Sequence, residues 1–130
     1  MIVEWINPPT LPAPIAHYSH VARAGNTLYI SGQIGADASG QVTAIGDPRA
    51  QARQAWRNVL AILEHFGAGP RNLVKTSTFV THPAFRAHAA EARDEVFPAP
   101  PYPPSTLLIV SALAEPHILV ELEAIAVLND

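Results

Sequence analysis

Two carboxylates near the C-terminus have the spacing that points most directly to chemistry. Glu121 and Glu123 lie two apart within an apolar run that extends from Ile118 to Leu128. Residues two apart in a β-strand point to the same face of a sheet, so we expect both carboxylates on one face. A carboxylate removed from water needs a partner or a raised pKa. The pair therefore indicates either a general base that orients water, or an ion pair at an interface, for instance with an arginine of a neighbouring subunit.

The histidines do not form a recognisable metal site. His17 and His20 are three apart, as are His88 and Glu91, and on a helix such a pair can share a metal. However, His17 lies in an extended, proline-rich stretch, and no third ligand is spaced to complete a site. We therefore interpret the histidines as surface or partly buried structural residues, and we expect no metal. The chain also lacks the GxSxG, Walker A, HExxH and GxGxxG patterns, so common hydrolase, NTPase, metalloprotease and dinucleotide sites have no support.

Length and composition narrow the class of protein. A chain of 130 residues is one domain, and 48% apolar with 15% charged residues is typical of a globular core. A net charge of -3 with only 7% aromatics is a poor composition for binding nucleic acid. No apolar run approaches the ~20 residues that span a bilayer, so we expect no membrane contact. The first residues lack the pattern of a secretory signal, which makes the cytoplasm the expected location.

Turn and capping signals divide the chain into alternating elements. Gly25-Asn26 is a two-residue hairpin signal between two short strands, and Asp47-Pro48 is typical of a helix start, with Gly67 at its end. The stretch from Gly32 to Gly46 is expected to be an exposed loop, and Thr81-His82-Pro83 is expected to open a second helix. The predicted strands are Val21–Ala24, Thr27–Ser31, Leu73–Val80, Thr106–Val110 and Ile118–Leu128.

The order of these elements predicts an uncovered sheet face. Each helix lies between strands, so the crossovers should place both helices on one face of a mixed sheet. The opposite face is also largely apolar, and such a face usually finds its second layer in another subunit. The pattern therefore predicts a homo-oligomer. In the last strand the two faces are Val120, Leu122, Ala124, Ala126 and Leu128 on one side, and Leu119, Glu121, Glu123, Ile125 and Val127 on the other.

Several motifs resemble those of the Rid family, the reactive intermediate deaminases also called YjgF or L-PSP. They are His17 to Gly35 with Ser31-Gly32-Gln33 inside it, Gln51, Asn58 to Leu63, Leu73 to Thr76, and Val120 to Ala126. The match covers the chain from about Ala16 to its end. The resemblance implies an α+β, chorismate-mutase-like fold, a mixed β-sheet with two helices packed on one face, as a single Rid-like domain over residues 1–130. It also implies a homotrimer with ligand clefts between subunits.

The resemblance also implies an activity and a set of site residues. Active members hydrolyse imines or enamines, release ammonia and need no cofactor. Glu121 matches the glutamate that helps to orient the attacking water, and Tyr18 and Ser31 match cleft positions. When Ser105-Thr106 is aligned with the residues that follow the family's substrate-clamping arginine, Pro104 stands in the arginine's place. The candidate site is therefore Glu121 as the catalytic residue, with Tyr18, Ser31, Pro104, Ser105 and Thr106 as substrate-binding residues.

The proline in the arginine's position leaves three functions open. The chain resembles an arginine-lacking branch, in which a divergent hydrolase or deaminase would act on a substrate that is bulkier or less acidic than 2-aminoacrylate. A non-catalytic trimeric protein that binds a small metabolite is the second hypothesis. A ribonuclease is the weakest, because of the net charge and because the histidines form no recognisable acid–base pair. Arg93 of the second helix is either a replacement anchor for the substrate or a surface residue.

Overall fold

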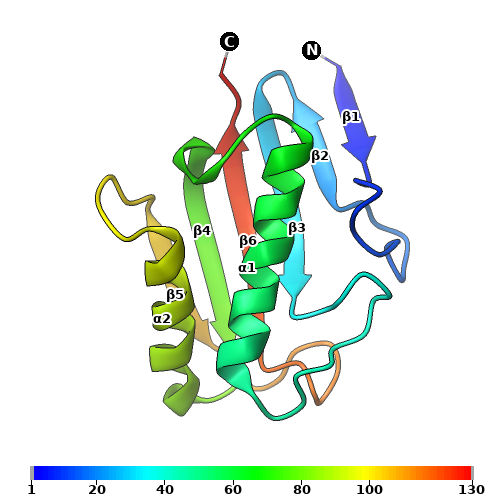
Figure 1. Ribbon diagram of the computed structural model, residues 1–130. Coiled ribbons are helices and arrows are strands. Elements are labelled where there is room, and N and C mark those ends of the chain that lie inside the picture. The colour runs from blue at the N-terminus through cyan, green and yellow to red at the C-terminus, as the bar shows by residue number, and fades with distance from the viewer. Residues whose placement is uncertain (1, 130) are drawn as a thin grey trace.

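The computed structural model describes residues 2–129 as one six-stranded sheet with two helices against it (Figure 1). The strand order is β1-β2-β3-β6-β4-β5, so the last strand in the chain is near the middle of the sheet. The elements are β1 (Val3–Ile6), β2 (Val21–Ala24), β3 (Thr27–Ile34), α1 (Pro48–His65), η1 (Pro70–Asn72), β4 (Leu73–Val80), η2 (Pro83–Phe85), α2 (Arg86–Val96), β5 (Ser105–Ile109) and β6 (Val120–Val127), where η1 and η2 are short 3₁₀ turns.

The connections explain why both helices lie on one face. β4 and β5 are parallel neighbours, and the other neighbouring pairs are antiparallel. A parallel pair needs a crossover, which α2 provides, while α1 crosses from β3 to β4 over β6. Both helices are in front of the sheet in Figure 1. This confirms the predicted α+β fold with a mixed sheet and helices on one face. Among the described residues, neither helix is long and apolar enough to cross a membrane.

Helix α1 begins and ends where its capping residues predict. The Asp47 side chain accepts a hydrogen bond from the Ala50 backbone N–H at 3.0 Å, and Pro48 occupies the first turn, where its missing N–H is not needed. The helix ends at His65, and Gly67 then takes φ +69°, the left-handed conformation that glycine adopts without strain. These local signals fix the length of the helix that covers the sheet.

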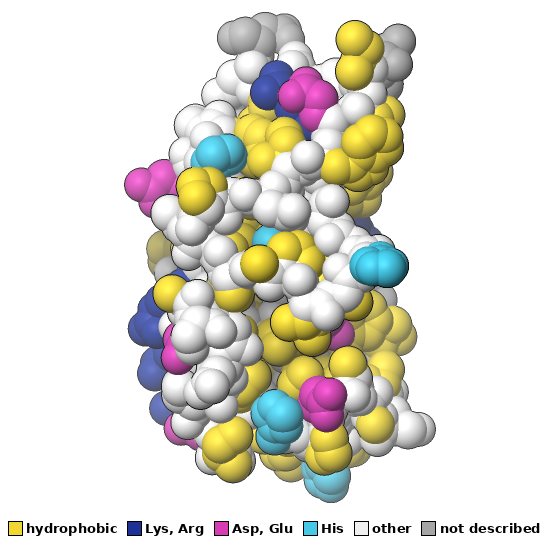
Figure 2. Space-filling view, turned by 90° about the vertical axis from the view of Figure 1, so that its right-hand side faces the viewer, with side chains coloured by type: hydrophobic (Ala, Val, Ile, Leu, Met, Phe, Trp, Pro, Cys, Tyr) yellow, Lys and Arg dark blue, Asp and Glu magenta, His cyan; other side chains and the backbone are white. Residues whose placement is uncertain are grey.

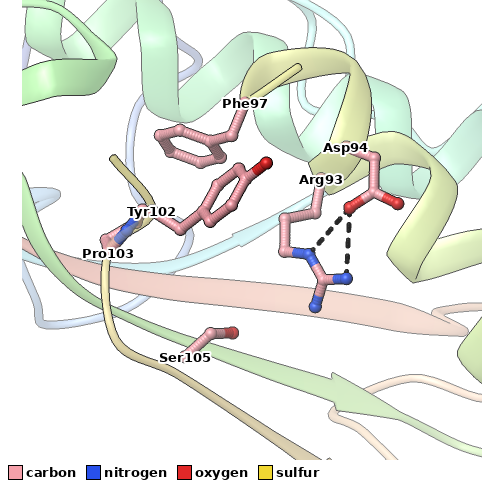
Figure 3. Close-up of a pocket in the computed structure, with 6 residues that line it drawn as sticks. All are labelled: Arg93, Asp94, Phe97, Tyr102, Pro103 and Ser105. Atoms are coloured by element: carbon pink, nitrogen blue, oxygen red, sulfur yellow. Dashed lines mark hydrogen bonds and ion pairs between the residues drawn. The ribbon is translucent and has the colours of Figure 1, made fainter. Parts of the chain in front are cut away.

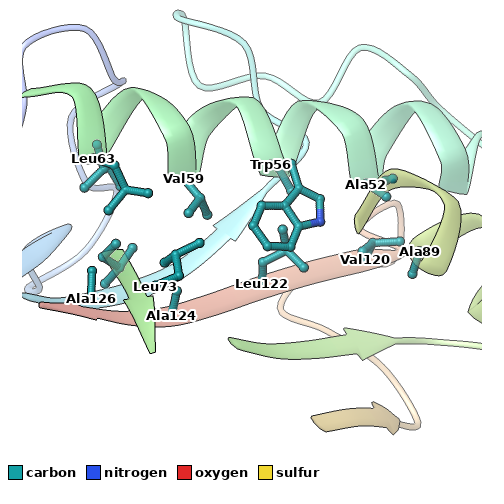
Figure 4. Close-up of a cluster of buried hydrophobic side chains, with 14 of the residues drawn as sticks. Ala52, Trp56, Val59, Leu63, Leu73, Ala89, Val120, Leu122, Ala124 and Ala126 are labelled. Atoms are coloured by element: carbon teal, nitrogen blue, oxygen red, sulfur yellow. The ribbon is translucent and has the colours of Figure 1, made fainter. Parts of the chain in front are cut away.

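The core lies between α1 and the inner face of β6 (Figure 4). Trp56, Val59 and Leu63 point from the helix toward the sheet, and Leu122 and Ala124 of β6 meet them. The predicted alternation of β6 is confirmed, because Val120, Leu122, Ala124 and Ala126 are buried while the residues between them are partly or fully exposed. Burial of each large aliphatic side chain stabilises the fold by about 1.5–3 kcal/mol.

Several boundaries differ from the sequence predictions. The edge strand β1 was not predicted, because four residues are too few to show a period and only pairing with β2 makes them a strand. β3 continues to Ile34, so the expected loop begins later than Gly32. The second helix starts with the turn η2 at Pro83, before α2 proper. β5 and β6 are Ser105–Ile109 and Val120–Val127, displaced or trimmed by one or two residues from their predicted limits.

Gln51 ties α1 to two loops at one end of the sheet. Its side chain is fully buried, and its Nε2 donates to the carbonyl oxygens of Ala44 and His117 at 3.1 and 2.9 Å. Its Oε1 accepts from the Leu119 backbone N–H at 2.9 Å. One amide thus bonds three buried or partly buried backbone groups; the Ala44 carbonyl also accepts from the Asp47 N–H, whereas the His117 carbonyl and the Leu119 N–H depend on Gln51. This connection fixes the loop that leads into β6.

Replacement of Gln51 should therefore destabilise the fold. We expect Gln51→Leu to lower the free energy of unfolding by about 2–4 kcal/mol, because it leaves the His117 carbonyl and the Leu119 N–H unsatisfied. Urea denaturation monitored by circular dichroism measures this change. Gln41→Leu, at an exposed side chain, is the matched control. An effect of Gln51→Leu no larger than that of Gln41→Leu would show that the three hydrogen bonds add no stability.

Candidate functional site

A β-bulge in β3 creates the space that the Glu121 carboxylate occupies. Ile30 pairs with Ala124 and Gln33 pairs with Leu122, so Ser31 and Gly32 together face Glu123 alone. A Cβ atom built on Gly32 would lie 2.8 Å from Glu121 Cδ, closer than real Cβ contacts allow. Glycine at this position therefore lets the carboxylate lie directly against the backbone of β3. Gly32 was expected to start a loop, and a glycine inside a strand pattern was the signal for this close approach.

The electrostatic surroundings raise the pKa of Glu121. The side chain is partly buried, and desolvation is the main cause of the shift, followed by the charge of Glu123. Within the part of the chain that the structure describes, the carboxylate has no hydrogen-bond or ion-pair partner. Glu121 therefore has the properties that suit a carboxylate to accept and return a proton.

Tyr18 and Ser31 lie close to Gly32, the residue against which this carboxylate packs. Tyr18 and Gly32 line one small pocket of about 70 Å³, together with Ile15 and Ile34, and Ile34 is the residue paired with Glu121 across β3 and β6. Ser31 precedes Gly32, and its hydroxyl is buried with no hydrogen-bond partner in residues 2–129. An unpartnered buried hydroxyl beside an unpartnered carboxylate leaves donor and acceptor capacity for a ligand or water.

A buried histidine supports the segment that carries Tyr18. His20 Nε2 lies 2.7 Å from the Pro12 carbonyl oxygen, which can only accept, so Nε2 carries the proton. Its Nδ1 then accepts from Gln33 Nε2 at 3.2 Å, and that amide also donates to the Ser31 carbonyl. His20 thus connects the proline-rich N-terminal segment to the bulge. This agrees with the interpretation of His20 as a structural residue, and no group of three or more His, Asp or Glu among the described residues is placed to hold a metal.

The other predicted site residues lie elsewhere on the protomer. Ser105 and Thr106 pair with Thr76 and Ser77, and β4 separates them from β6. Pro104 lies two strands away from Glu121 across the sheet and four residues away along it. With the usual spacing between strands and rise per residue, the two residues are about 16 Å apart. Thr106 accepts a hydrogen bond from Lys75 Nζ at 2.6 Å. One protomer therefore places Tyr18, Ser31 and Glu121 around Gly32 but does not bring Pro104, Ser105 or Thr106 to them.

Among residues 2–129, no helix or strand covers the face of the sheet that carries both glutamates. Tyr29 and Leu108 are about half exposed on it, at 50% and 48%, and Glu123 lines a shallow pocket of about 210 Å³ with Tyr29 and Lys75. Figure 2 views the molecule from the β1 side, and hydrophobic side chains run down its right-hand border, away from the helices. The predicted apolar second face is therefore present.

Comparison with known proteins identifies the family. Residues 9–128 match the family model described as endoribonuclease L-PSP. The chain belongs to the L-PSP family. This is the Rid or YjgF family that the sequence motifs resemble. A 2-iminobutanoate/2-iminopropanoate deaminase from the mite Dermatophagoides farinae is 32% identical over 124 residues, which cover 95% of both chains.

Solved structures of the L-PSP or Rid family share the whole fold. RidA from an Antarctic Psychrobacter species superposes with a TM-score of 0.87 at 32% identity, and covers 96% of this chain and 99% of its own. The Rid protein YyfA from Yersinia pestis, described as of unknown function, gives a TM-score of 0.90 at 29% identity, over 98% and 100% of the two chains. The six strands and two helices described above are therefore the fold of the family.

We expect Gly32→Ala to expel the Glu121 carboxylate from its position. The new methyl group would take that space, and the flexible glutamate would turn toward water, so the pKa of Glu121 should fall toward its ordinary value. Titration followed by NMR of the carboxyl carbon measures the pKa. Gly69→Ala is the control, because a Cβ atom there meets nothing within 4 Å. A pKa that remains raised in Gly32→Ala would contradict the contact.

Glu121→Gln should stabilise the protein at neutral pH. A carboxyl whose pKa is raised in the folded state favours folding below its unfolded value of about 4.5, and this contribution is lost as the pH rises through the folded value. The ionised carboxylate therefore lowers stability at neutral pH, and the neutral amide removes that effect. Thermal unfolding should give a higher Tm for Glu121→Gln at neutral pH and nearly equal values near pH 4. A gain that does not change with pH would contradict this explanation.

Proposed function

We propose that the chain is a deaminase-type hydrolase that acts on a reactive imine or enamine and releases ammonia. The observation that carries the proposal is the partly buried Glu121 carboxylate, which packs against Gly32; Tyr18 and the Ser31 hydroxyl lie close to that glycine, and neither the carboxylate nor the hydroxyl has a hydrogen-bond partner within residues 2–129. The 2-iminobutanoate/2-iminopropanoate deaminase of the mite, which matches over 95% of this chain, supports the same reaction class. The reaction needs no cofactor, and we propose that the protein works in the cytoplasm.

The hydrolysis divides into addition of water and loss of ammonia. Ionised Glu121 accepts a proton from a water molecule, while the water oxygen adds to the carbon of the C=N bond and the electron pair moves to nitrogen. The protonated carboxyl then returns its proton to nitrogen. The carboxylate next accepts the hydroxyl proton and passes it to nitrogen, the C–N bond breaks, and ammonia leaves as the carbonyl forms. A raised pKa suits this exchange, because the carboxyl must both take and give a proton near neutral pH.

We propose that the complete cleft forms between subunits of a homotrimer. Pro104, Ser105 and Thr106 lie on the edge strand β5 or next to it, about 16 Å from Glu121 of the same protomer. The exposed apolar side chains of the glutamate face favour contact with another copy, which could bring its β5 edge to Glu121. Tyr18, Ser31 and Glu121 would then come from one subunit, and Pro104 to Thr106 from its neighbour.

Pro104 sets the proposed substrate apart from that of arginine-bearing relatives. Proline provides neither charge nor N–H, so a substrate carboxylate loses a bidentate contact at this position. Such a contact stabilises binding by about 1.5–3 kcal/mol. We therefore propose that this chain belongs to an arginine-lacking branch of the family, and that its substrate is larger or less acidic than 2-aminoacrylate.

Release of ammonia from imines of graded size tests the activity. Imines made in the assay by an amino-acid oxidase should be hydrolysed faster when derived from leucine or phenylalanine than from alanine. Glu121→Gln should reduce the rate by about 100-fold or more, whereas Glu123→Gln, on the same strand and face, should retain most of it. The rate should also fall as acid protonates Glu121, with a midpoint above 4.5. Equal rates for wild type and Glu121→Gln would reject the role of Glu121.

Mixing of two inactive variants tests whether the cleft is shared. Glu121→Gln removes the carboxylate, and Thr106→Trp fills the proposed substrate side. If each cleft takes these residues from different subunits, each mixed trimer should contain one intact cleft, which is about a quarter of all clefts in an equal mixture, and activity should return. A chain that carries both changes, mixed with inactive Glu121→Gln, should regain none. Absence of activity in verified mixed trimers of the two single variants would place the whole cleft within one subunit.

The substitution of proline for the anchoring arginine also favours a second function, non-catalytic binding of a small metabolite. Metabolites that raise the Tm without any product, in assays where Glu121→Gln and wild type behave alike, would support the binding protein over the enzyme. The name of the matched family model also calls for an RNA-cleavage assay with the same variants. RNA cleavage that disappears in Glu121→Gln would replace the deaminase proposal.

A further inference from the structure

A second pocket lies at the edge of the sheet, between the end of α2 and the start of β5 (Figure 3). It has a volume of about 260 Å³ and is lined by Arg93, Asp94, Phe97, Tyr102, Pro103 and Ser105. Ser105 pairs with Thr76, whose side chain is buried under the helices, so this pocket opens on the helix side of the sheet. Glu121 points to the opposite face. The pocket is therefore separate from Tyr18, Ser31 and Glu121 of the same protomer, and Ser105 is the one residue of the predicted substrate-binding set that lines it.

The positive charge of Arg93 in this pocket is available to a ligand. Arg93 donates through Nε and Nη2 to a single oxygen of Asp94, at 3.2 and 3.1 Å. Both side chains are well exposed, at 40% and 69%, and an exposed pair between adjacent residues stabilises the fold very little. In Figure 3 the guanidinium extends toward Ser105, and the Ser105 hydroxyl points to the same side. A ligand carboxylate can therefore compete with that of Asp94 for the guanidinium.

The other residues that line the pocket favour a ligand with an apolar ring. Phe97 is almost fully buried, at 8%, and its ring packs edge-on against Trp56 with centroids 5.6 Å apart, so it forms a fixed floor. Tyr102 and Pro103 form the outer wall. Drug-sized ligands occupy pockets of ~300–1,000 Å³, so this smaller pocket suits one ring with a short acidic group. We propose that it binds a small aromatic carboxylate, with Arg93 and Ser105 holding the carboxylate and Phe97 and Tyr102 contacting the ring.

Arg93 thereby has a role as the carboxylate-binding residue of this pocket. Arg93 does not take the position of the absent arginine beside Glu121 in its own protomer, because the two residues serve opposite faces of the sheet. Binding at the Arg93 pocket requires no catalysis, so the proposal does not depend on the deaminase proposal. Failure of either one leaves the other intact.

NMR titration of the full-length protein with benzoate tests the proposal. Benzoate should shift the backbone amide signals of Phe97, Tyr102 and Ser105, and neutral benzamide should bind at least tenfold more weakly. Arg93→Gln should weaken benzoate binding by about ten- to a hundredfold, because it removes a charge-assisted contact. Arg86→Gln, at an exposed arginine of the same helix, is the matched control and should bind as the wild type does.

Asp94→Asn tests the proposal through a gain in benzoate affinity. It removes the carboxylate that competes for Arg93, so benzoate should bind more tightly, by several-fold, and loss of structure could not produce that gain. Glu121→Gln should leave benzoate binding unchanged. The proposal is overturned if benzoate binds Arg93→Gln as well as wild type, if benzamide binds equally well, if the shifts centre on Gly32 and Glu121, or if no saturable binding occurs.

Discussion

The register of β6 is the constraint on which the candidate site depends. Val120, Leu122, Ala124 and Ala126 are buried beneath the helices, and a shift by one residue would expose all four while burying two glutamates. The apolar core therefore decides which face Glu121 occupies. The position of the carboxylate therefore does not depend on a hydrogen bond or ion pair of its own. The packing that stabilises the fold also keeps this charged group in a position that is unfavourable for stability.

The bulge in β3 complements this arrangement from the neighbouring strand. Without the extra residue, the strand would continue its regular alternation and no glycine would lie under the carboxylate. The bulge also leaves the Ser31 carbonyl to accept from Gln33, which in turn meets buried His20. The site thus lies next to neutral polar groups that are hydrogen-bonded to one another. Its own donor and acceptor, Ser31 and Glu121, have no such partners among the described residues.

Local signals in the sequence predict most of the fold but only part of the site. The Asp47 cap, the Gly25-Asn26 turn and the alternation of β6 each depend on nearby residues, and each is confirmed. β1 was missed because only pairing with β2 defines it. Glu121 could be selected from its spacing, since a charge in an apolar strand is conspicuous. Its contact with Gly32, and the pocket that joins Arg93 to Ser105, depend on pairing between distant segments, which the residue pattern alone does not specify.

The proline-rich segment that leads into β5 has a consequence for selectivity. Residues 98–104 contain five prolines, and each fixes its own φ angle, so the segment has few conformations to lose even before the chain folds. Tyr102 and Pro103 form a pocket wall that is partly exposed to solvent. Because of the prolines, this wall is nevertheless preorganised for binding. Such a wall cannot reshape itself around different molecules. It should discriminate by shape, and accept a narrow range of ligands with little loss of entropy on binding.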